Sequence, residues 1–174
     1  MESVDPGATI AWRFLRYWKL IAIAAAVVAL DQASKAWIAA ALPFNTYGEA
    51  SGAIPVVRGF FYIVHVGNTG AAWSILSGRS VLLAALAGAT LVGIFLGRRA
   101  LGLASPGTQA CFGLMCGGII GNLIDRLARG HVVDFLDLHF GTYVYPTFNV
   151  ADSAICVGVA LYLISSLRSP SMPV

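Results

Sequence analysis

Residues 20–42, LIAIAAAVVALDQASKAWIAAAL, form an apolar stretch that is interrupted by a short polar patch containing Asp31 and Lys35. About 20 apolar residues in a helix are enough to cross the hydrocarbon core of a bilayer. An ionised side chain at the bilayer centre costs roughly 2.5 to 3.5 kcal/mol, even on the milder insertion scales. Such residues usually face a bundle interior or a water-filled cavity, so this stretch predicts a transmembrane helix that contributes to a polar site.

Three further stretches, at residues 80–97, 108–127 and 150–167, are also long and apolar enough to span a membrane. The chain has 174 residues, of which 58% are hydrophobic and 11% are charged, and its mean hydropathy is +0.79. A soluble domain of this length would be less apolar and more highly charged. We therefore predict an all-α polytopic membrane protein, in which residues 1–174 form a single integral-membrane domain with four transmembrane helices.

Basic residues mark the cytoplasmic side of a membrane protein under the positive-inside rule. They precede the first span, separate the second from the third and follow the fourth, at Arg13, Arg16, Lys19, Arg98, Arg99 and Arg168. Residues 1–19 and 168–174, which contain both termini, are therefore predicted to be cytoplasmic, and residues 43–79 and 128–149 to form periplasmic loops. The formal net charge of +3 then reflects membrane orientation, so we expect no nucleic-acid partner.

A cleaved secretory signal is an alternative interpretation of the first span, because basic residues precede it and residues 39–41 are three alanines that resemble a cleavage site. Asp31 and Lys35, however, fall where such a signal has an uninterrupted apolar core. Removing the segment would also leave three spans whose basic flanking residues no longer fit the positive-inside rule. We therefore expect the first helix to be retained.

With this orientation, the polar residues of the spans and loops gather on the outer side of the membrane. The set consists of Asp31, Lys35, Asn68, Asn122, Asp125, Arg126, Asp134, Asp137, Asn149 and Asp152. Asp31 and Lys35 share one helix face at positions i and i+4, as do Asn122 and Arg126. We predict that these side chains line one pocket at the outer membrane face.

Residues 56–66, in the first outer loop, are rich in Val, Phe, Tyr and Ile, which favour strands. Glycines and a proline bound this run, and the loop is too long for a plain turn. We predict a small β-sheet in the first periplasmic loop that helps to enclose the pocket. The alternative is an interfacial belt of aromatic residues without a catalytic part.

Paired carboxylates in such a pocket would share a proton. Two of them ~4 Å apart, in an effective dielectric near 20, repel by roughly 4 kcal/mol, which is equivalent to about three pKa units. One member can then deprotonate a water molecule while its protonated neighbour polarises a carbonyl, as in aspartic proteases. Spacing in the chain does not choose the pair among four candidates, Asp125, Asp134, Asp137 and Asp152.

Other functions use the same residue types. His131, Asp134, Asp137 and His139 carry metal-binding groups, but the chain has no His-Glu-x-x-His helix, and we expect no metal site. A small proton-coupled membrane transporter is the principal alternative function, since paired acids within four spans also suit a proton relay. A non-catalytic scaffold, in which the acids only hold helices together, is a further alternative.

Five short motifs that contain these polar residues follow one another along the chain. They are Asp31-Gln-Ala-Ser-Lys35, Asn68-Thr-Gly-Ala-Ala-Trp-Ser74, Gly117-Gly-Ile-Ile-Gly-Asn-Leu-Ile-Asp-Arg126, Val132-Val-Asp-Phe135 and Phe148-Asn-Val-Ala-Asp-Ser153. In this order, the motifs resemble those of bacterial lipoprotein signal peptidase, also called signal peptidase II. Each motif is weak alone, whereas five in register are highly specific.

The resemblance implies an aspartic endopeptidase of the bacterial cell inner membrane, with its active site toward the periplasmic face. Its activity would be to remove the signal peptide from diacylglyceryl-modified prolipoproteins, cleaving before the lipidated cysteine. Carried over by position, Asp134 and Asp152 are the catalytic dyad. The supporting and substrate-binding positions are Asp31, Lys35, Asn68, Asn122, Arg126 and Asn149. The resemblance implies no cofactor, and we expect a monomer whose partners are a lipidated prolipoprotein and membrane lipid.

We hypothesise distinct roles for these supporting residues. Asn68 and Asn149 orient substrate carbonyls, and Arg126 ties the third helix to the outer loop. Asp31 and Lys35 together stabilise the pocket.

Overall fold

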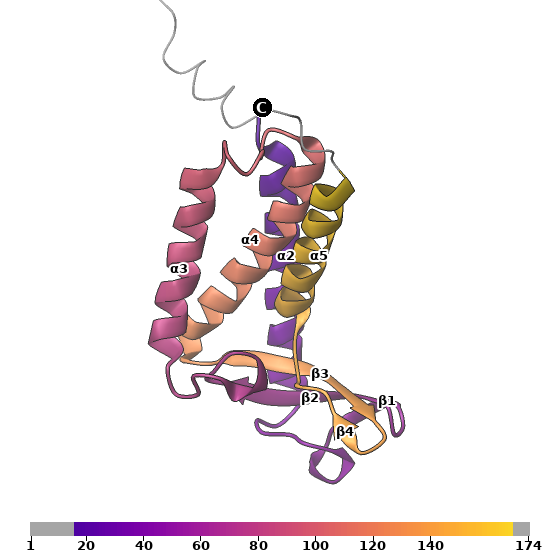
Figure 1. The fold of residues 1–174 in the computed structure, drawn as a ribbon. Helices are drawn as coiled ribbons and strands as arrows, with labels where there is room; N and C mark the ends of the chain where they lie inside the picture. Colours follow the sequence, from indigo (N-terminus) through magenta and orange to yellow (C-terminus); the bar gives the residue numbers. More distant parts are fainter. Residues whose placement is uncertain (1–15, 169–174) are drawn as a thin grey trace, which may run out of the picture.

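Four long helices form a bundle, and a small sheet lies across one end of it (Figure 1). The structure, a computed structural model, describes residues 16–168. Its long helices are α2 (Trp18–Ala41), α3 (Ser80–Gly97), α4 (Pro106–Arg129) and α5 (Val150–Arg168), and its short 3-10 helices are η1 (Glu49–Ser51) and η2 (Ala72–Ser74). Each long helix is apolar enough to cross a membrane, which confirms the predicted four-helix membrane fold.

The predicted cytoplasmic tails lie almost entirely in residues 1–15 and 169–174, outside the described residues. The placement of both termini in the cytoplasm therefore stays a prediction. Helices α2 and α4 run toward the sheet, whereas α3 and α5 run away from it (Figure 1). All long connections that carry predicted site residues are thus at the sheet end of the bundle.

Helix α4 is the most deeply buried of the four, with 56% of its apolar window inside the protein. Glycines on two of its faces allow close contact with its neighbours. A Cβ atom at Gly117 would lie 2.7 Å from the Cβ of Val27 and 2.8 Å from the carbonyl oxygen of Ala24, both on α2. A Cβ atom at Gly118 would collide with the backbone of Ala151 on α5. Small residues therefore let α4 pack tightly between α2 and α5.

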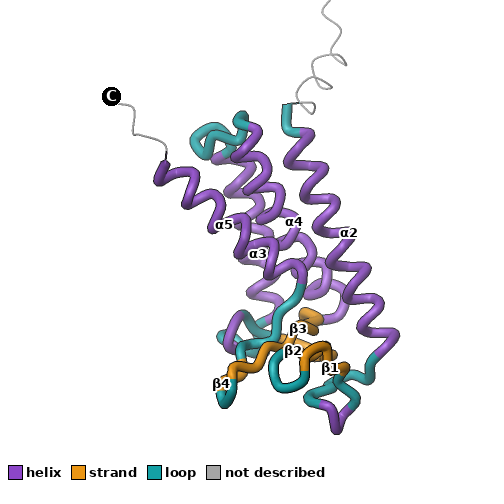
Figure 2. Tube along the Cα trace, turned by 90° about the vertical axis from the view of Figure 1, so that its right-hand side faces the viewer, coloured by secondary structure: helices purple, strands orange, loops and turns teal. Residues whose placement is uncertain are grey.

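Helix α4 also crosses the bundle obliquely, as Figures 1 and 2 show. It lies beside α2 and α5 over most of its length, and its part near the sheet also lies beside the beginning of α3. Helix α3 consequently stands at the edge of the bundle, and Ala84, near its sheet end, is the one buried residue of this described helix. The far half of α3 is thus separated from α2.

The sheet is antiparallel, with the strand order β1-β2-β3-β4. Its strands are β1 (Ile54–Val57), β2 (Phe61–Asn68), β3 (Val132–Phe140) and β4 (Tyr143–Val144). Val133 and Phe135 of β3 pack against the buried Ile38 near the end of α2. This apolar cluster fastens the sheet to the bundle.

The predicted small sheet is confirmed, but its strands do not come from the first loop alone. Half of them, β3 and β4, come from residues 128–149, which were expected to form only a loop. The first four residues of β3 are all buried, so its polar and apolar residues do not alternate as they do in a half-exposed strand. That absence of alternation hid the strand from the sequence pattern.

Candidate active site

A cavity of about 420 Å³ lies where the sheet meets the helix bundle. Asp134, on β3, and Asp152, in the first turn of α5, both line it. Asn68 of β2, together with Asn122 and Arg126 of α4, completes its polar lining. Residues that are far apart in the sequence therefore converge on one cavity of the size that usually binds small ligands or peptide segments.

The position of Asp152 follows from the way in which α5 begins. The side-chain Oδ1 of Asn149 accepts a hydrogen bond from the backbone N–H of Asp152 over 2.9 Å. In return, Asp152 Oδ2 accepts one from the backbone N–H of Asn149 over 3.3 Å. This reciprocal arrangement is a capping box, and it holds the carboxylate beside the positive end of the helix macrodipole.

Asparagine side chains connect the carboxyl groups of Asp134 and Asp152. Asn149 Nδ2 donates to Asp134 Oδ1 over 2.7 Å, and Asn122 Nδ2 donates to Asp152 Oδ1 over 2.7 Å. Asn149 Nδ2 also donates to Asn122 Oδ1 over 3.2 Å, so the two amides are linked. The remaining oxygen of Asp134, Oδ2, accepts from Asn68 Nδ2 over 3.0 Å. Neutral amide donors therefore hold both carboxyl groups in place.

A cluster of buried charges lies next to this pair. Lys35 Nζ is 2.8 Å from Asp31 Oδ2 and 2.8 Å from Asp125 Oδ2, and it donates to Asn122 Oδ1 over 3.0 Å. The three charged side chains have no exposed surface. Burying an ion costs several kcal/mol unless its partners compensate fully. Each of the three ammonium hydrogens has an acceptor here, which provides that compensation.

The acids of this cluster also hold the backbone beside the carboxyl pair. Asp31 Oδ1 accepts a hydrogen bond from the N–H of Ala151 over 3.0 Å. Asp125 Oδ2 accepts one from the N–H of Val133 over 3.2 Å. Ala151 and Val133 each immediately precede one member of the carboxyl pair in the chain. The buried cluster therefore fixes the starts of α5 and β3 relative to α2 and α4.

Asp134 titrates well above the usual range of an aspartate. Burial raises the pKa of Asp134 to about 7, and the neighbouring charge of Asp152 adds to the increase. Hydrogen bonds from Asn68 and Asn149 act in the opposite direction, as does the charge of Lys35. Close carboxyl groups with such a raised pKa share a proton near neutral pH, so that one is an acid and the other a base.

The other two acids considered for the pair do not line the cavity. Asp125 is held by Lys35. Asp137 lies three residues after Asp134 on β3 and therefore on the opposite face of the strand. Its Oδ2 lies 2.7 Å from Nε2 of His139. The structure thus brings one pair of the four candidates together at the cavity and leaves the other two outside it.

The histidines of the metal hypothesis are engaged in other contacts. His131 packs against Phe44, with ring centroids 5.3 Å apart. His139 contacts both Asp137 and the ring of Tyr62. Among residues 16–168, no group of three His, Cys, Asp or Glu side chains has an arrangement that could hold a metal ion.

Arg126 connects α4 to the first outer loop, because its Nη2 donates to the carbonyl oxygen of Gly70 over 3.1 Å. Its Nε is buried and has no hydrogen-bond partner among the described residues. A buried donor without a partner is costly, and Arg126 lines the cavity. This N–H group is therefore an unused hydrogen-bond donor on a residue that lines the cavity.

Aromatic residues on the cavity wall were missed by the sequence analysis. The rings of Trp73 and Tyr145 have centroids 6.3 Å apart, and those of Tyr145 and Phe148 are 5.8 Å apart. Trp73 has a φ of +53°, a conformation that is rare for bulky residues and concentrated at functional sites. Its only sequence signal was its place in the motif that contains Asn68, and Tyr145 had none.

The fold and the site together define a class: integral-membrane proteins of four helices that hold a carboxyl pair in a cavity at one end of the bundle. A comparison with protein families identifies the family within that class. The sequence model described as signal peptidase (SPase) II matches residues 23–168, so this chain belongs to the signal peptidase II family. The chain is therefore a membrane-embedded peptidase.

Lipoprotein signal peptidases of several bacteria are similar to this chain over most of their length. That of Nitratidesulfovibrio vulgaris is 36% identical over 161 residues, which cover 90% of this chain and 94% of that protein. That of Bacillus subtilis is 40% identical over 152 residues, which cover 83% and 90%. That of Chromobacterium violaceum is 42% identical over 168 residues, which cover 90% and 96%.

Two solved structures share the fold, and each is described as a bacterial membrane enzyme determined by the in meso method. One gives a TM-score of 0.77 at 33% identity and covers 87% of this chain and 89% of its own. The other gives a TM-score of 0.74 at 33% identity and covers 86% and 93%. The architecture of bundle and sheet is therefore shared with known membrane enzymes.

Proposed function

We propose that this chain is an aspartic endopeptidase that removes the signal peptide from diacylglyceryl-modified prolipoproteins and cleaves before the lipidated cysteine. One observation carries the proposal: Asp134 and Asp152 line the same cavity and are held there by neutral amides. Membership of the signal peptidase II family, and the names of the similar lipoprotein signal peptidases, support the substrate class.

The proposed reaction uses the two carboxyl groups as one acid and one base. The ionised carboxylate takes a proton from water, and the water oxygen bonds to the scissile carbonyl carbon. At the same time, the protonated carboxyl gives its proton to the carbonyl oxygen. When the C–N bond breaks, the amine nitrogen takes the proton that water released. The former carbonyl oxygen returns its proton, so both carboxyl groups regain their starting states.

Neutral and cationic donors assist this reaction in different ways. Asn68 and Asn149 position Asp134 without cancelling its charge. Asn68 lines the cavity, and we assign it the orientation of substrate carbonyls as well. Asn149 is fully buried, does not line the cavity and already donates its amide N–H groups within the protein, so we assign it only the positioning of the carboxyl pair. The unpartnered Nε–H of Arg126 is the donor that we assign to the carbonyl oxygen of the substrate. A fixed donor of this kind stabilises negative charge that develops on that oxygen in the transition state.

The position of the cavity supports a substrate that is anchored by lipid. A diacylated cysteine holds its peptide bond near the membrane interface, and the cavity lies at the end of the four spans. We propose that this end faces the periplasm from a bacterial inner membrane and that the chain works as a monomer. Arg16, Lys19, Arg98, Arg99 and Arg168 flank the spans at the opposite end, where the described residues include no acid, and they support this orientation.

The distribution of acids weighs against the proton-coupled transporter. A proton relay across a bilayer uses ionisable side chains at several depths. The carboxylates of residues 16–168 all belong to the sheet half of the molecule: Asp31, Glu49, Asp125, Asp134, Asp137 and Asp152. Among the described residues, the far half of the bundle therefore provides no acid for such a relay.

A cleavage assay tests the proposal. Purified protein in detergent is incubated with a synthetic diacylglyceryl-modified precursor peptide, and the products are identified by mass spectrometry. We expect Asp134→Asn and Asp152→Asn each to slow cleavage by about 10³-fold. Asp137→Asn is the matched control, since it removes an acid from the other face of the same strand, and it should cleave normally. Cleavage at the normal rate by either dyad variant would remove that residue from the pair.

Three further measurements separate the proposal from its alternatives. Cleavage should be unaffected by a chelator, whereas a metal peptidase would be inhibited. A precursor without the diacylglyceryl group should be cut slowly or not at all, and equal cleavage of both precursors would contradict the substrate class. Proton-coupled flux in proteoliposomes, together with absence of proteolysis, would instead identify a transporter.

A further inference from the structure

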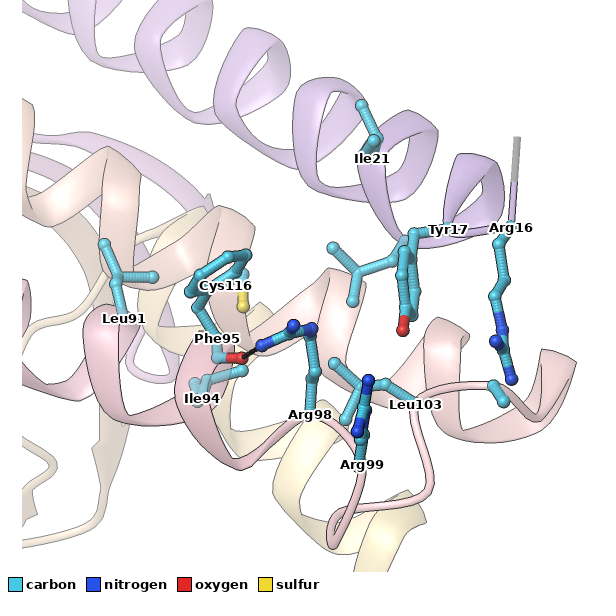
Figure 3. A pocket seen from close by; sticks show the side chains of 12 residues that line it. Arg16, Tyr17, Ile21, Leu91, Ile94, Phe95, Arg98, Arg99, Leu103 and Cys116 are labelled. Atoms are coloured by element: carbon cyan, nitrogen blue, oxygen red, sulfur yellow. Dashed lines mark hydrogen bonds between the residues drawn. The ribbon is translucent and has the colours of Figure 1, made fainter. Parts of the chain in front are cut away.

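A second cavity, of about 870 Å³, lies at the end of the bundle opposite the sheet (Figure 3). Its walls come from the beginning of α2, the far half of α3, the loop between α3 and α4, and the middle of α4. Strand β3 and the start of α5, which carry the carboxyl pair, lie at the other end of the helices (Figure 1). This cavity therefore has no part in the proposed hydrolysis.

The course of α4 explains why the bundle is open here. Since α4 leaves α3 as it crosses toward α2 and α5, the far half of α3 lacks a helix packed against its inner side (Figures 1 and 2). Leu91 and Ile94 of α3 therefore face the cavity together with Ile21 of α2. The opening is built by helix packing and is a fixed feature of the fold.

Three arginines surround one end of this cavity: Arg16, Arg98 and Arg99. Phe95 holds Arg98 in place. The Nη1 of Arg98 donates to the carbonyl oxygen of Phe95 over 2.8 Å, and its guanidinium carbon lies 4.6 Å from the centre of the Phe95 ring. Within residues 16–168, none of the three arginines forms an ion pair with a carboxylate. The hydroxyl group of Tyr17 points to the same region (Figure 3).

Below the arginines the cavity is apolar. Leu91 lies six residues before Gly97, where α3 ends, a distance of about 9 Å along the helix axis at 1.5 Å per residue. Cys116, on the opposite wall, is buried within α4. The cavity thus combines a cationic rim at the level of the helix ends with an apolar interior that extends into the membrane-spanning region.

We propose that this cavity binds an anionic phospholipid, with the phosphate at Arg16, Arg98 and Arg99 and an acyl chain along Leu91 and Ile94. Guanidinium groups bind phosphate with good geometry, and basic pockets between transmembrane helices recognise acidic head groups. Charge complementarity selects this occupant over the basic end of a signal peptide, which three arginines would repel. The inference does not depend on the proposed hydrolysis.

Lipid retention measures the proposal directly. The purified full chain in detergent is titrated with phosphatidylglycerol or phosphatidylcholine, and bound lipid is counted by native mass spectrometry. We expect selective binding of phosphatidylglycerol, weakened roughly 10- to 30-fold in the double variant Arg98→Gln with Arg99→Gln. The matched control is Arg58→Gln with Arg79→Gln, which removes the same charge at the sheet end and should bind as the unmodified chain does.

Two further variants identify what the cavity holds. Ile94→Trp, which fills the apolar part, should reduce lipid binding while leaving all three arginines in place. Equal binding of the two lipids, or unchanged binding by the Arg98 and Arg99 double variant, would overturn the proposal. It would also be overturned if phosphatidylglycerol bound only after deletion of residues 2–12, because the chain's own N-terminal segment would then be the occupant.

Discussion

Two pairs of acids at the sheet end of the bundle differ in what neutralises them. The cation-paired acids, Asp31 and Asp125, share the ammonium group of Lys35. The amide-held acids, Asp134 and Asp152, accept hydrogen bonds from asparagines. A buried cation cancels the repulsion within the first pair, whereas neutral donors leave it in the second. The same residue type is therefore structural in one place and chemically poised in the other.

Removing one amide-held acid should have the largest effect on activity. Asp152→Asn keeps an oxygen that can complete the capping box but cannot exchange a proton with water. We expect cleavage to fall by about 10³-fold while the melting temperature in detergent changes little. A parallel loss of folding in this variant would show that Asp152 is a structural acid, which would erase the distinction between the two pairs.

Removing the shared cation should have the largest effect on stability. In Lys35→Met, the buried Asp31 loses its ion-pair partner and Asp125 is left with Arg129 alone, which we expect to lower the free energy of unfolding by about 3–5 kcal/mol. For a chain of this length, that corresponds to a fall in melting temperature of roughly 10 °C. Lys19→Met, near the start of the same helix, is the control and should melt almost as the unmodified chain does. A normal melting temperature for Lys35→Met would mean that the cation is not what stabilises the first pair.

The dependence of stability on pH should distinguish the amide-held pair. The pKa of Asp134 is about 7 in the folded chain, against an ordinary aspartate value of 3.8 in the unfolded chain. Between these pH values the folded chain therefore binds more protons than the unfolded chain does. Stability therefore falls as pH rises through this window. Asp134→Asn should remove that loss, with an upper limit of about 4 kcal/mol above pH 7, and should melt like the unmodified chain below pH 4. Thermal melting of both proteins from pH 4 to 8 measures the difference.

The smallest expected effect concerns one amide donor. Asn68→Ala deletes a hydrogen bond that lowers the pKa of Asp134, so this pKa should rise further. We expect cleavage to slow by about tenfold and the alkaline limb of the pH–rate profile to move to higher pH. Thr69→Ala, at the next position, should leave the profile unchanged. An alkaline limb that stays in place in Asn68→Ala would indicate that Asn68 only supports the loop.

Sequence patterns predicted the helices better than the sheet. Each long helix is an extended run of apolar residues, so its presence is apparent from a window of about 20 positions. Strand β3 has nine residues, contains two aspartates and is buried over its first four residues. Its structure depends on pairing with β2, which lies more than 60 residues earlier, and on packing against Ile38. Such long-range contacts leave no local pattern.

The candidate site shows the same division. Depth along the predicted helices was sufficient to collect the polar residues on one side of the membrane, and the resemblance to signal peptidase II singled out Asp134 and Asp152. The purely physical argument left four candidate acids, because spacing along the chain does not select a pair. Asp134 and Asp137, for example, are only three residues apart in the same segment. Only the pleat of β3 separates them, by turning Asp134 toward the cavity and Asp137 toward His139.

The amino-acid sequence alone was enough to define a four-helix membrane protein, because the transfer free energy of a helix is a sum over its own residues. It also predicted an approximate depth for each polar residue within the spans. Which acids share Lys35 and which meet at the cavity was decided by tertiary structure, since the glycine contacts of α4 and the pairing of β2 with β3 bring those groups together. Electrostatic interactions depend on distances in space, and the order of residues in a chain does not contain those distances.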